Sequence, residues 1–196
     1  MVSRFSRVSK QRLKSQAYLT ESDLEKADTL NKFFSSVFVH EDDQNVPEFK
    51  SDFKTSLLSI NITTDDMFKC LKSLKVSKSP GPDNIHPKVL RETASELAYP
   101  FKLLFDETIK AGKIPSKWKT AEVRPIFKKG IKTEPGNYRP VSLTSIVCKI
   151  FETFVRDALC SHLINNDLLS TDQFGFCKGR SCITQLLSTL YDWFSY

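Results

Sequence analysis

Val123-Arg-Pro-Ile-Phe-Lys-Lys-Gly130 is followed, after a polar gap, by Asn137-Tyr-Arg-Pro-Val-Ser-Leu143. Each of these two short runs alternates apolar and polar residues, and a loop rich in lysine and glycine separates them. Each run also contains one proline, Pro125 or Pro140. Because proline cannot donate a hydrogen bond to a sheet ladder, such strands lie at a sheet edge or project from the sheet. The pattern therefore predicts a protruding β-hairpin.

The predicted hairpin carries a cluster of positive charge. Lys128, Lys129 and Lys132 lie near its tip, and Arg139 lies on the returning strand. Arginine offers a planar fork for bidentate contact with phosphate, and lysine adds a point charge. These residues favour a polyphosphate or a nucleic-acid backbone as the ligand.

Positive charge is concentrated in two segments of the chain, whose net charge is +6. Residues 1–20 hold five basic and no acidic residues, and residues 110–132 hold eight basic residues and one acidic residue. Clustered cations favour phosphate backbones through counterion release. For 1–20, a solvated linker explains the charges equally well. For 110–132 we favour a binding role, because the cations alternate with Trp118, Ile126 and Phe127.

Composition sets wider limits on the protein. Its 196 residues are 40% hydrophobic, which allows a packed core. No run approaches the roughly 18 apolar residues of a membrane span, and the N-terminus has no secretory pattern, so we expect no membrane partner. Five scattered cysteines indicate reduced thiols in the nucleus or cytoplasm, and their spacing does not favour zinc.

Helical patterns fill most of the remaining sequence. Ser22 with Glu25, and Thr63 or Thr64, are predicted to begin helices, while Gly112 ends one. We expect apolar stripes at Leu24, Ala27, Leu30, Phe34 and Phe38; at Met67, Leu71 and Leu74; at Val89, Leu90 and Leu97; and at Phe101, Leu104, Phe105 and Ile109. Pro87 and Pro100 are each expected to begin a helix, and further helices are expected at about 145–163 and 181–196.

These patterns divide the chain into three predicted parts. Residues 1–19 form a basic arm or linker, 20–62 an extension with one helix and an acidic loop, and 63–196 the main domain. The fold class expected is α+β, mostly helical with a protruding β-hairpin.

Several landmarks occur in a fixed order along the chain. They are Lys78-Ser-Pro-Gly-Pro-Asp83, Pro115 with Trp118-Lys119, Pro125-Ile-Phe-Lys-Lys-Gly130, Asn137-Tyr-Arg-Pro-Val-Ser-Leu-Thr-Ser145, and Gln173-Phe-Gly-Phe176 with Gly179-Arg-Ser181. Together they resemble the reverse transcriptase of non-long-terminal-repeat (LINE, jockey-like) retrotransposons, from about Leu30 to the last residue.

The resemblance implies the fingers, and the start of the palm, of a right-hand polymerase. It assigns the nucleotide's triphosphate to Arg139 with Lys128 or Lys129 beside it, and Lys132 competes for the same role. It places Ser79, Gly81, Asp83, Gly179 and Arg180 near the template. The implied partners are an RNA template, a DNA primer and a dNTP, together with the palm and thumb of a longer protein.

Structural roles compete with these assignments. Ser-Pro-Gly-Pro-Asp by itself is usually a turn, in which Asp83 does no more than hold the backbone. Phe174 and Phe176 are expected in a core.

The polymerase family uses Mg²⁺ held by acidic residues, one in an aromatic-x-Asp strand and others in an Ala-Asp-Asp turn. Neither motif occurs in this sequence, so we expect no catalytic residue and no metal ligand in it. The first interpretation is a reverse-transcriptase fragment that is inactive alone. A non-catalytic RNA- or DNA-binding module and an inert relic are the alternatives.

Overall fold

The computed structural model describes residues 3–5, 12–15, 19–38, 55–57, 59–175, 177 and 179–195. They form two units. The first holds the described residues up to 38 and from 61 to 153, and the second holds those between 53 and 60 and those from 154 onward. The division falls inside a helix rather than near residue 62, and the three predicted parts stay a prediction.

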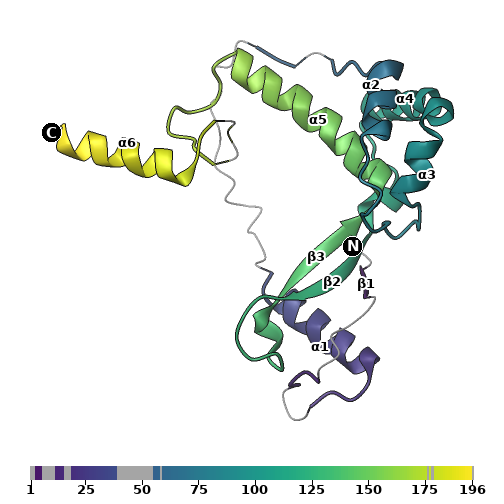
Figure 1. The fold of residues 1–196 in the computed structure, drawn as a ribbon, viewed down its shortest axis with the longest axis vertical. Coiled ribbons are helices and arrows are strands. Elements are labelled where there is room, and N and C mark those ends of the chain that lie inside the picture. Colours follow the sequence, from purple (N-terminus) through teal and green to yellow (C-terminus); the bar gives the residue numbers. More distant parts are fainter. Residues whose placement is uncertain are drawn as a thin grey trace. The chain divides into compact units, whose positions relative to one another are not determined.

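The predicted hairpin is present in the first unit. Strand β2 (Ala121–Phe127) pairs antiparallel with β3 (Tyr138–Thr144). A short strand β1 (Ser3–Phe5), which the sequence did not predict, pairs parallel with β2, so the sheet order is β1-β2-β3 (Figure 1). Strand β3 lies at the edge as expected, whereas β2 is covered on one side from Ala121 to Val123. The fold is thus a mixture of helix and sheet.

The two prolines of the hairpin face each other across the ladder, Pro125 opposite Pro140. The amide of Lys128 donates to the carbonyl oxygen of Asn137 at 2.8 Å, and bonded pairs alternate along an antiparallel ladder. The proline pair therefore occupies a non-bonded position, where the nitrogens of both residues point outward. Two prolines cost this ladder no hydrogen bond between its strands.

Helix α1 (Asp23–Ser36) packs against the turn end of the hairpin (Figure 1). The predicted capping box of Ser22 and Glu25 is confirmed, and Leu30 and Phe34 are buried as expected. The predicted burial of Leu24 and Phe38 is wrong, since both are largely exposed. They lie at the two ends of the helix, and the contacts with the hairpin turn involve only its middle.

Helices α2 (Thr64–Lys72), α3 (Pro87–Glu92) and α4 (Ala94–Ala111) pack together in the same unit. Thr63 caps α2, Pro87 is the first residue of α3, and Gly112 ends α4 with a left-handed φ of 61°, all as predicted. The inward faces are confirmed for Met67, Leu71, Leu90 and Phe105 and wrong for Val89 and Leu104, which are exposed.

The prediction that Pro100 begins a helix is wrong, because α4 starts at Ala94 and Pro100 lies inside it. Proline removes one helical hydrogen bond. The turns ahead of it are held by tertiary packing, since Ala94 and Ala98 are both buried.

The short 3-10 helix η2 (Ser116–Lys119) and the start of α5 (Ile146–Asn165) complete the core of the first unit. The ring of Phe105 lies 5.8 Å from that of Trp118 and 5.2 Å from that of Phe151, centroid to centroid. This aromatic cluster joins α4, η2 and α5 where the hairpin begins. The helix predicted at 145–163 is confirmed.

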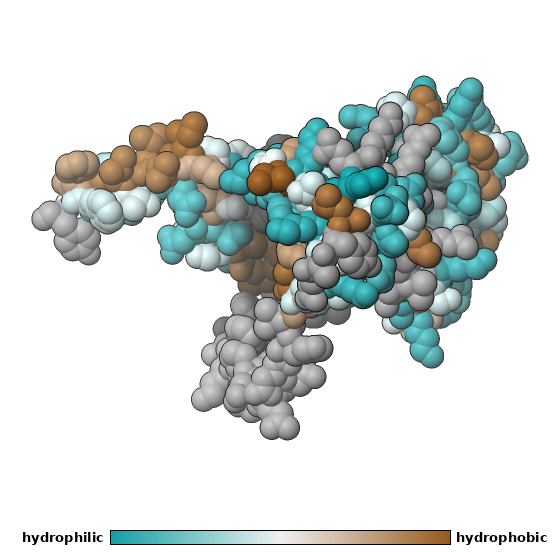
Figure 2. Space-filling model, turned by 90° about the horizontal axis from the view of Figure 1, so that it is seen from below, coloured by the Kyte–Doolittle hydropathy of each residue, from teal (hydrophilic) through white to brown (hydrophobic). Residues whose placement is uncertain are grey.

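The second unit contains the later part of α5 and helix α6 (Cys182–Phe194), whose N-cap is Ser181. The apolar residues of α6 are exposed, and Figure 2 shows hydrophobic residues gathered along this helix. The exposed set is Ile183, Leu186, Leu187, Leu190, Tyr191, Trp193 and Phe194. Across the described ranges, no helix combines the length and apolar character that crossing a bilayer requires.

Candidate nucleic-acid interface

One face of the hairpin is anchored in the core. Tyr138 is 5% exposed and packs with Leu13, Leu30 and Phe34, and its ring lies 5.6 Å from that of Phe127. Phe127 and Tyr138 are opposite each other in the ladder, so their side chains share this face. We call it the inner face.

The opposite, outer face carries positive charge. Side chains alternate between faces along a strand, so Arg139, which follows Tyr138, points outward. Its partner across the ladder is Ile126, and the diagonal neighbours on the other strand are Arg124 and Lys128. Arg139 and Lys128 are exposed. The outer face therefore holds three cations around an exposed isoleucine.

The three cations differ in their partners. Arg124 Nε forms an ion pair with Glu122 Oε1 at 3.1 Å, and the Glu122 side chain is only 16% exposed, so much of the Arg124 charge is compensated. Among the described residues, no carboxylate pairs with Arg139 or Lys128. These two side chains are therefore free to contact an anion.

Side chains at the base of the returning strand hold the lysine loop in place. Asn137 Nδ2 donates to the carbonyl oxygen of Ile131 at 2.9 Å, and the Tyr138 hydroxyl donates to that of Lys132 at 2.7 Å. Gly130 supplies a left-handed φ of 88°. Asn137 and Tyr138 were not selected as site residues from the sequence, although their position just before Arg139 was a usable signal.

The loop also separates the lysines that the sequence could not rank. The Lys132 ammonium lies 5.6 Å from the centroid of the Phe127 ring, which belongs to the inner face. Lys129 stands in the turn next to Gly130, beyond the last ladder pair. Only Lys128 continues the outer face beside Arg139.

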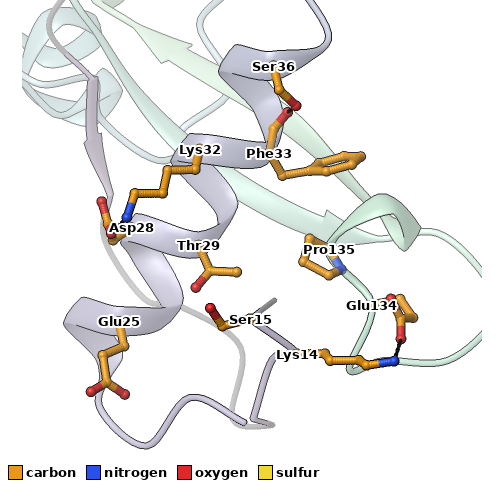
Figure 3. A pocket seen from close by; sticks show the side chains of 10 residues that line it. All are labelled: Lys14, Ser15, Glu25, Asp28, Thr29, Lys32, Phe33, Ser36, Glu134 and Pro135. Atoms are coloured by element: carbon orange, nitrogen blue, oxygen red, sulfur yellow. Dashed lines mark hydrogen bonds and ion pairs between the residues drawn. The ribbon is translucent and has the colours of Figure 1, made fainter. Parts of the chain in front are cut away.

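A groove of about 610 Å³ lies between α1 and the hairpin turn (Figure 3). Its charges are already matched: Lys14 pairs with Glu134 at 3.6 Å and Lys32 with Asp28 at 2.7 Å. The Lys14 amide also donates to the Thr133 carbonyl oxygen at 2.7 Å. This groove is a seam that supports the turn rather than a place for an anion.

The Ser-Pro-Gly-Pro-Asp loop packs against the base of the hairpin. Gly81 is buried, and a Cβ placed there would lie 2.5 Å from the carbonyl oxygen of Thr144. Asp83 Oδ1 accepts a hydrogen bond from the amide of Ile85 at 3.1 Å, so Asp83 does hold the turn. Ser79 is exposed. The template role of all three stays a prediction.

Gly179 and Arg180 lie in the second unit, in a segment with its own internal contacts. Gly179 has a φ of 78°, and Arg180 Nη1 donates to the carbonyl oxygens of Thr171 and, at 2.8 Å, Gln173. The guanidinium carbon lies 5.1 Å from the centroid of Phe174, which is half-buried, while Phe176 lies outside the described residues. Arg180 thus organises this loop, and its template role stays a prediction.

Acidic residues do not converge on a metal site in the part of the chain that the structure describes. No three His, Cys, Asp or Glu side chains there lie close enough to hold an ion. The described residues do not fit the Mg²⁺ site of a polymerase, and we derive no step through it.

The order of motifs and the hairpin agree with comparisons of the whole sequence. The chain is a relative of the RNA-directed DNA polymerases of non-LTR retrotransposons, which confirms the resemblance. No family model matches it.

Three curated relatives illustrate this. The chain is 30% identical over 126 residues to "Probable RNA-directed DNA polymerase from transposon BS" of Drosophila melanogaster, covering 64% of this chain and 14% of the relative. It is 28% identical over 123 residues to "Retrovirus-related Pol polyprotein from type-1 retrotransposable element R1" of Bradysia coprophila, covering 62% and 12%. It is 27% identical over 128 residues to "RNA-directed DNA polymerase from mobile element jockey" of Drosophila melanogaster, covering 65% and 14%. The matched part is thus a small share of each relative.

Proposed function

We propose that this chain forms the fingers of a reverse transcriptase and binds the phosphates of nucleic acid or of an incoming nucleotide on the outer face of its hairpin. The observation that carries the proposal is the pair of exposed cations, Arg139 and Lys128, on the face opposite the anchored Phe127 and Tyr138. An anchored inner face keeps the outer cations in fixed positions, which lowers the entropy lost on binding.

The chemistry of this face suits a phosphate ligand. Arg139 offers a bidentate fork for two phosphate oxygens, and Lys128 adds a point charge beside it. Arg124 contributes less, because Glu122 already compensates it. The exposed Ile126 between the cations excludes some water from the contact.

The remaining assignments extend this proposal. An RNA template contacts Ser79, Gly81 and Asp83 in one unit and Gly179 and Arg180 in the other, and a DNA primer and a dNTP complete the ligands. A second candidate is a binding module without catalysis. It is favoured by the presence of phosphate-binding cations in a sequence that has neither acidic motif of the polymerase family.

Fluorescence anisotropy with a labelled single-stranded RNA, followed over a range of salt concentrations, tests the proposal. Arg139→Ala should weaken binding roughly tenfold, since a charge-assisted hydrogen bond contributes about 1.5 kcal/mol or more. Arg139→Ala and Lys128→Ala should each reduce the salt slope by about 0.7 per lost phosphate contact. Competition with a dNTP shows whether the same face takes a triphosphate.

Two matched variants keep this experiment specific. Lys129→Ala removes the same charge from the turn and should change the slope less than Lys128→Ala, and Arg91→Ala on α3 should leave it unchanged. Equal effects of Lys128→Ala and Lys129→Ala would contradict the assignment of the outer face. Binding that does not respond to salt would contradict the proposal as a whole.

A further inference from the structure

A second cavity, of about 550 Å³, lies at the base of the hairpin in the first unit. This volume falls within the roughly 300–1,000 Å³ of small-molecule sites. Its walls come from the Ser-Pro-Gly-Pro-Asp loop, α4, η2 and the start of α5. The lining residues used below are Asp83, Leu104, Lys117, Trp118, Thr120 and Ser145.

Ser145 is the unusual member of this lining. Its carbonyl oxygen accepts the first helical hydrogen bond of α5, from the amide of Lys149 at 3.1 Å, so Ser145 is the N-cap residue. Its side chain makes no capping bond, however. Ser145 is 2% exposed, and its hydroxyl has no hydrogen-bond partner among the described residues.

A buried hydroxyl without a partner costs free energy, so such groups are rare and call for an explanation. A ligand in the cavity that offers a hydrogen-bonding edge would satisfy it. The unused amides at the beginning of α5 favour a ligand with electronegative atoms at the same place.

The other walls restrict the shape of that ligand. Trp118 provides an aromatic surface, and its ring is fixed by Phe105 and by Phe151, whose ring centroids lie at 5.8 and 5.5 Å. Leu104 adds an apolar wall from α4. A flat, aromatic ligand stacks well on such a surface, and stacking tolerates every base.

Polar groups are few and stand at separate places. Thr120 is occupied by the Lys117 carbonyl oxygen, to which its hydroxyl donates at 2.8 Å. The Lys117 ammonium is exposed and has no carboxylate partner among the described residues. Asp83 uses one carboxylate oxygen in its own turn. A cation therefore lies beside a cavity with an aromatic wall and a buried hydroxyl.

We propose that this cavity receives one unstacked nucleobase of a single-stranded nucleic acid. The Ser145 hydroxyl hydrogen-bonds the edge of the base, Trp118 stacks on its face, and Lys117 contacts the adjoining phosphate. The inference extends the proposed function, because it adds a base-binding position to a chain that otherwise contacts phosphates.

The cavity and the outer cations can be tested separately. Six residues separate Arg139 from Ser145 along and just beyond β3, which corresponds to about 20 Å of extended chain. One mononucleotide cannot occupy both positions, so a mononucleotide reports on the cavity alone.

NMR spectra of the complete chain, titrated with AMP and with ribose 5-phosphate, provide this test. AMP should shift the indole N–H signal of Trp118 and the amide signals of Thr120 and Val147, and ribose 5-phosphate should not. No shift with AMP at millimolar concentration would overturn the proposal. Equal shifts with both compounds would indicate a phosphate site instead and would overturn it as well.

Variants on α4 supply a matched pair. Leu104→Trp places a ring into the cavity and should weaken AMP binding at least tenfold, as loss of one stacked base does. Leu103→Trp makes the same change at an exposed neighbour that does not line the cavity, and should leave binding unchanged. An equal response of both variants would contradict the position of the site.

Two further variants distinguish this inference from the proposed function. Ser145→Ala should weaken AMP binding several-fold in a chain that remains folded, and Arg139→Ala should not affect it. AMP shifts without salt-dependent RNA binding would refute the outer-face proposal alone. Salt-dependent RNA binding without AMP shifts would refute the base site alone.

Discussion

Replacing Gly81 with alanine should destabilise the first unit, because the new methyl group has no room. Its Cβ would lie 2.5 Å from the Thr144 carbonyl oxygen and 2.8 Å from both Cα and N of Ser145. Ordinary contact begins near 3.4 Å, so the loop must move by about 0.9 Å from a rigid strand end. Overpacking of this kind costs about 1–3 kcal/mol of unfolding free energy. For a chain of this size, that lowers Tm by about 2–4 °C per kcal/mol.

The measurement is urea unfolding followed by Trp118 fluorescence. A Trp193→Phe background removes the other tryptophan, so the signal comes from the first unit only. Gly136→Ala is the matched control: its Cβ would lie 3.4 Å from Cζ of Phe33, an ordinary contact, and its φ is not left-handed. We expect a change within about 0.5 kcal/mol for that variant.

Two outcomes would refute this reasoning. One is Gly81→Ala with the same unfolding free energy as the unmodified protein. The other is an equal loss in Gly81→Ala and Gly136→Ala, which would trace the effect to glycine in general. A Gly81→Ala protein of unchanged stability that has lost RNA binding would show that the residue contacts the template instead.

Two other predictions concern the hairpin support and a buried thiol. Tyr138→Phe removes the hydrogen bond to the Lys132 carbonyl oxygen and should cost about 1 kcal/mol or more in thermal unfolding, whereas Tyr99→Phe, at an exposed position, should cost nothing measurable; equal effects would contradict the role of this bond. Burial, and secondarily the Glu152 carboxylate, raise the pKa of the Cys148 thiol from 9.0 to about 11. Maleimide should therefore label the exposed Cys160 and Cys182 well before Cys148 at pH 8, as resolved by peptide mass spectrometry. Because the folded state favours the neutral thiol, this contribution to stability is complete below pH 9 and is lost as pH rises towards 11. Early labelling of Cys148 would contradict its burial.

Much of the fold could be predicted from local chemistry. The prolines and the alternation at Val123 and Leu143 indicated the hairpin, and Ser22, Thr63 and Gly112 marked helix ends through bonds formed within one turn. Strand β1 could not be predicted, because three residues carry no pattern and their partners are far along the chain. Pro100 misled for a similar reason: its local preference yields to the burial of Ala94 and Ala98.

The candidate site was predicted only in part. The sequence indicated that cations gather near the hairpin tip, but adjacent lysines cannot be assigned to faces without a register. The register, together with Tyr138 in the core, places Arg139 and Lys128 outward and brings in Arg124. The cavity at Ser145 was not foreseen, since its walls come from four segments that no sequence spacing relates.

The opposed prolines of the hairpin have a consequence for its edges. Their outward nitrogens face away from the β2–β3 ladder on both sides, at the same level. A further strand approaching either edge would find no amide donor there, and β1 indeed stops pairing at Val123, two residues before Pro125. Exposed strand edges promote association between chains, and proline at an edge opposes it. The pair thus keeps a long, cationic hairpin from being extended by another strand, so its outer face stays available to ligands rather than to copies of itself.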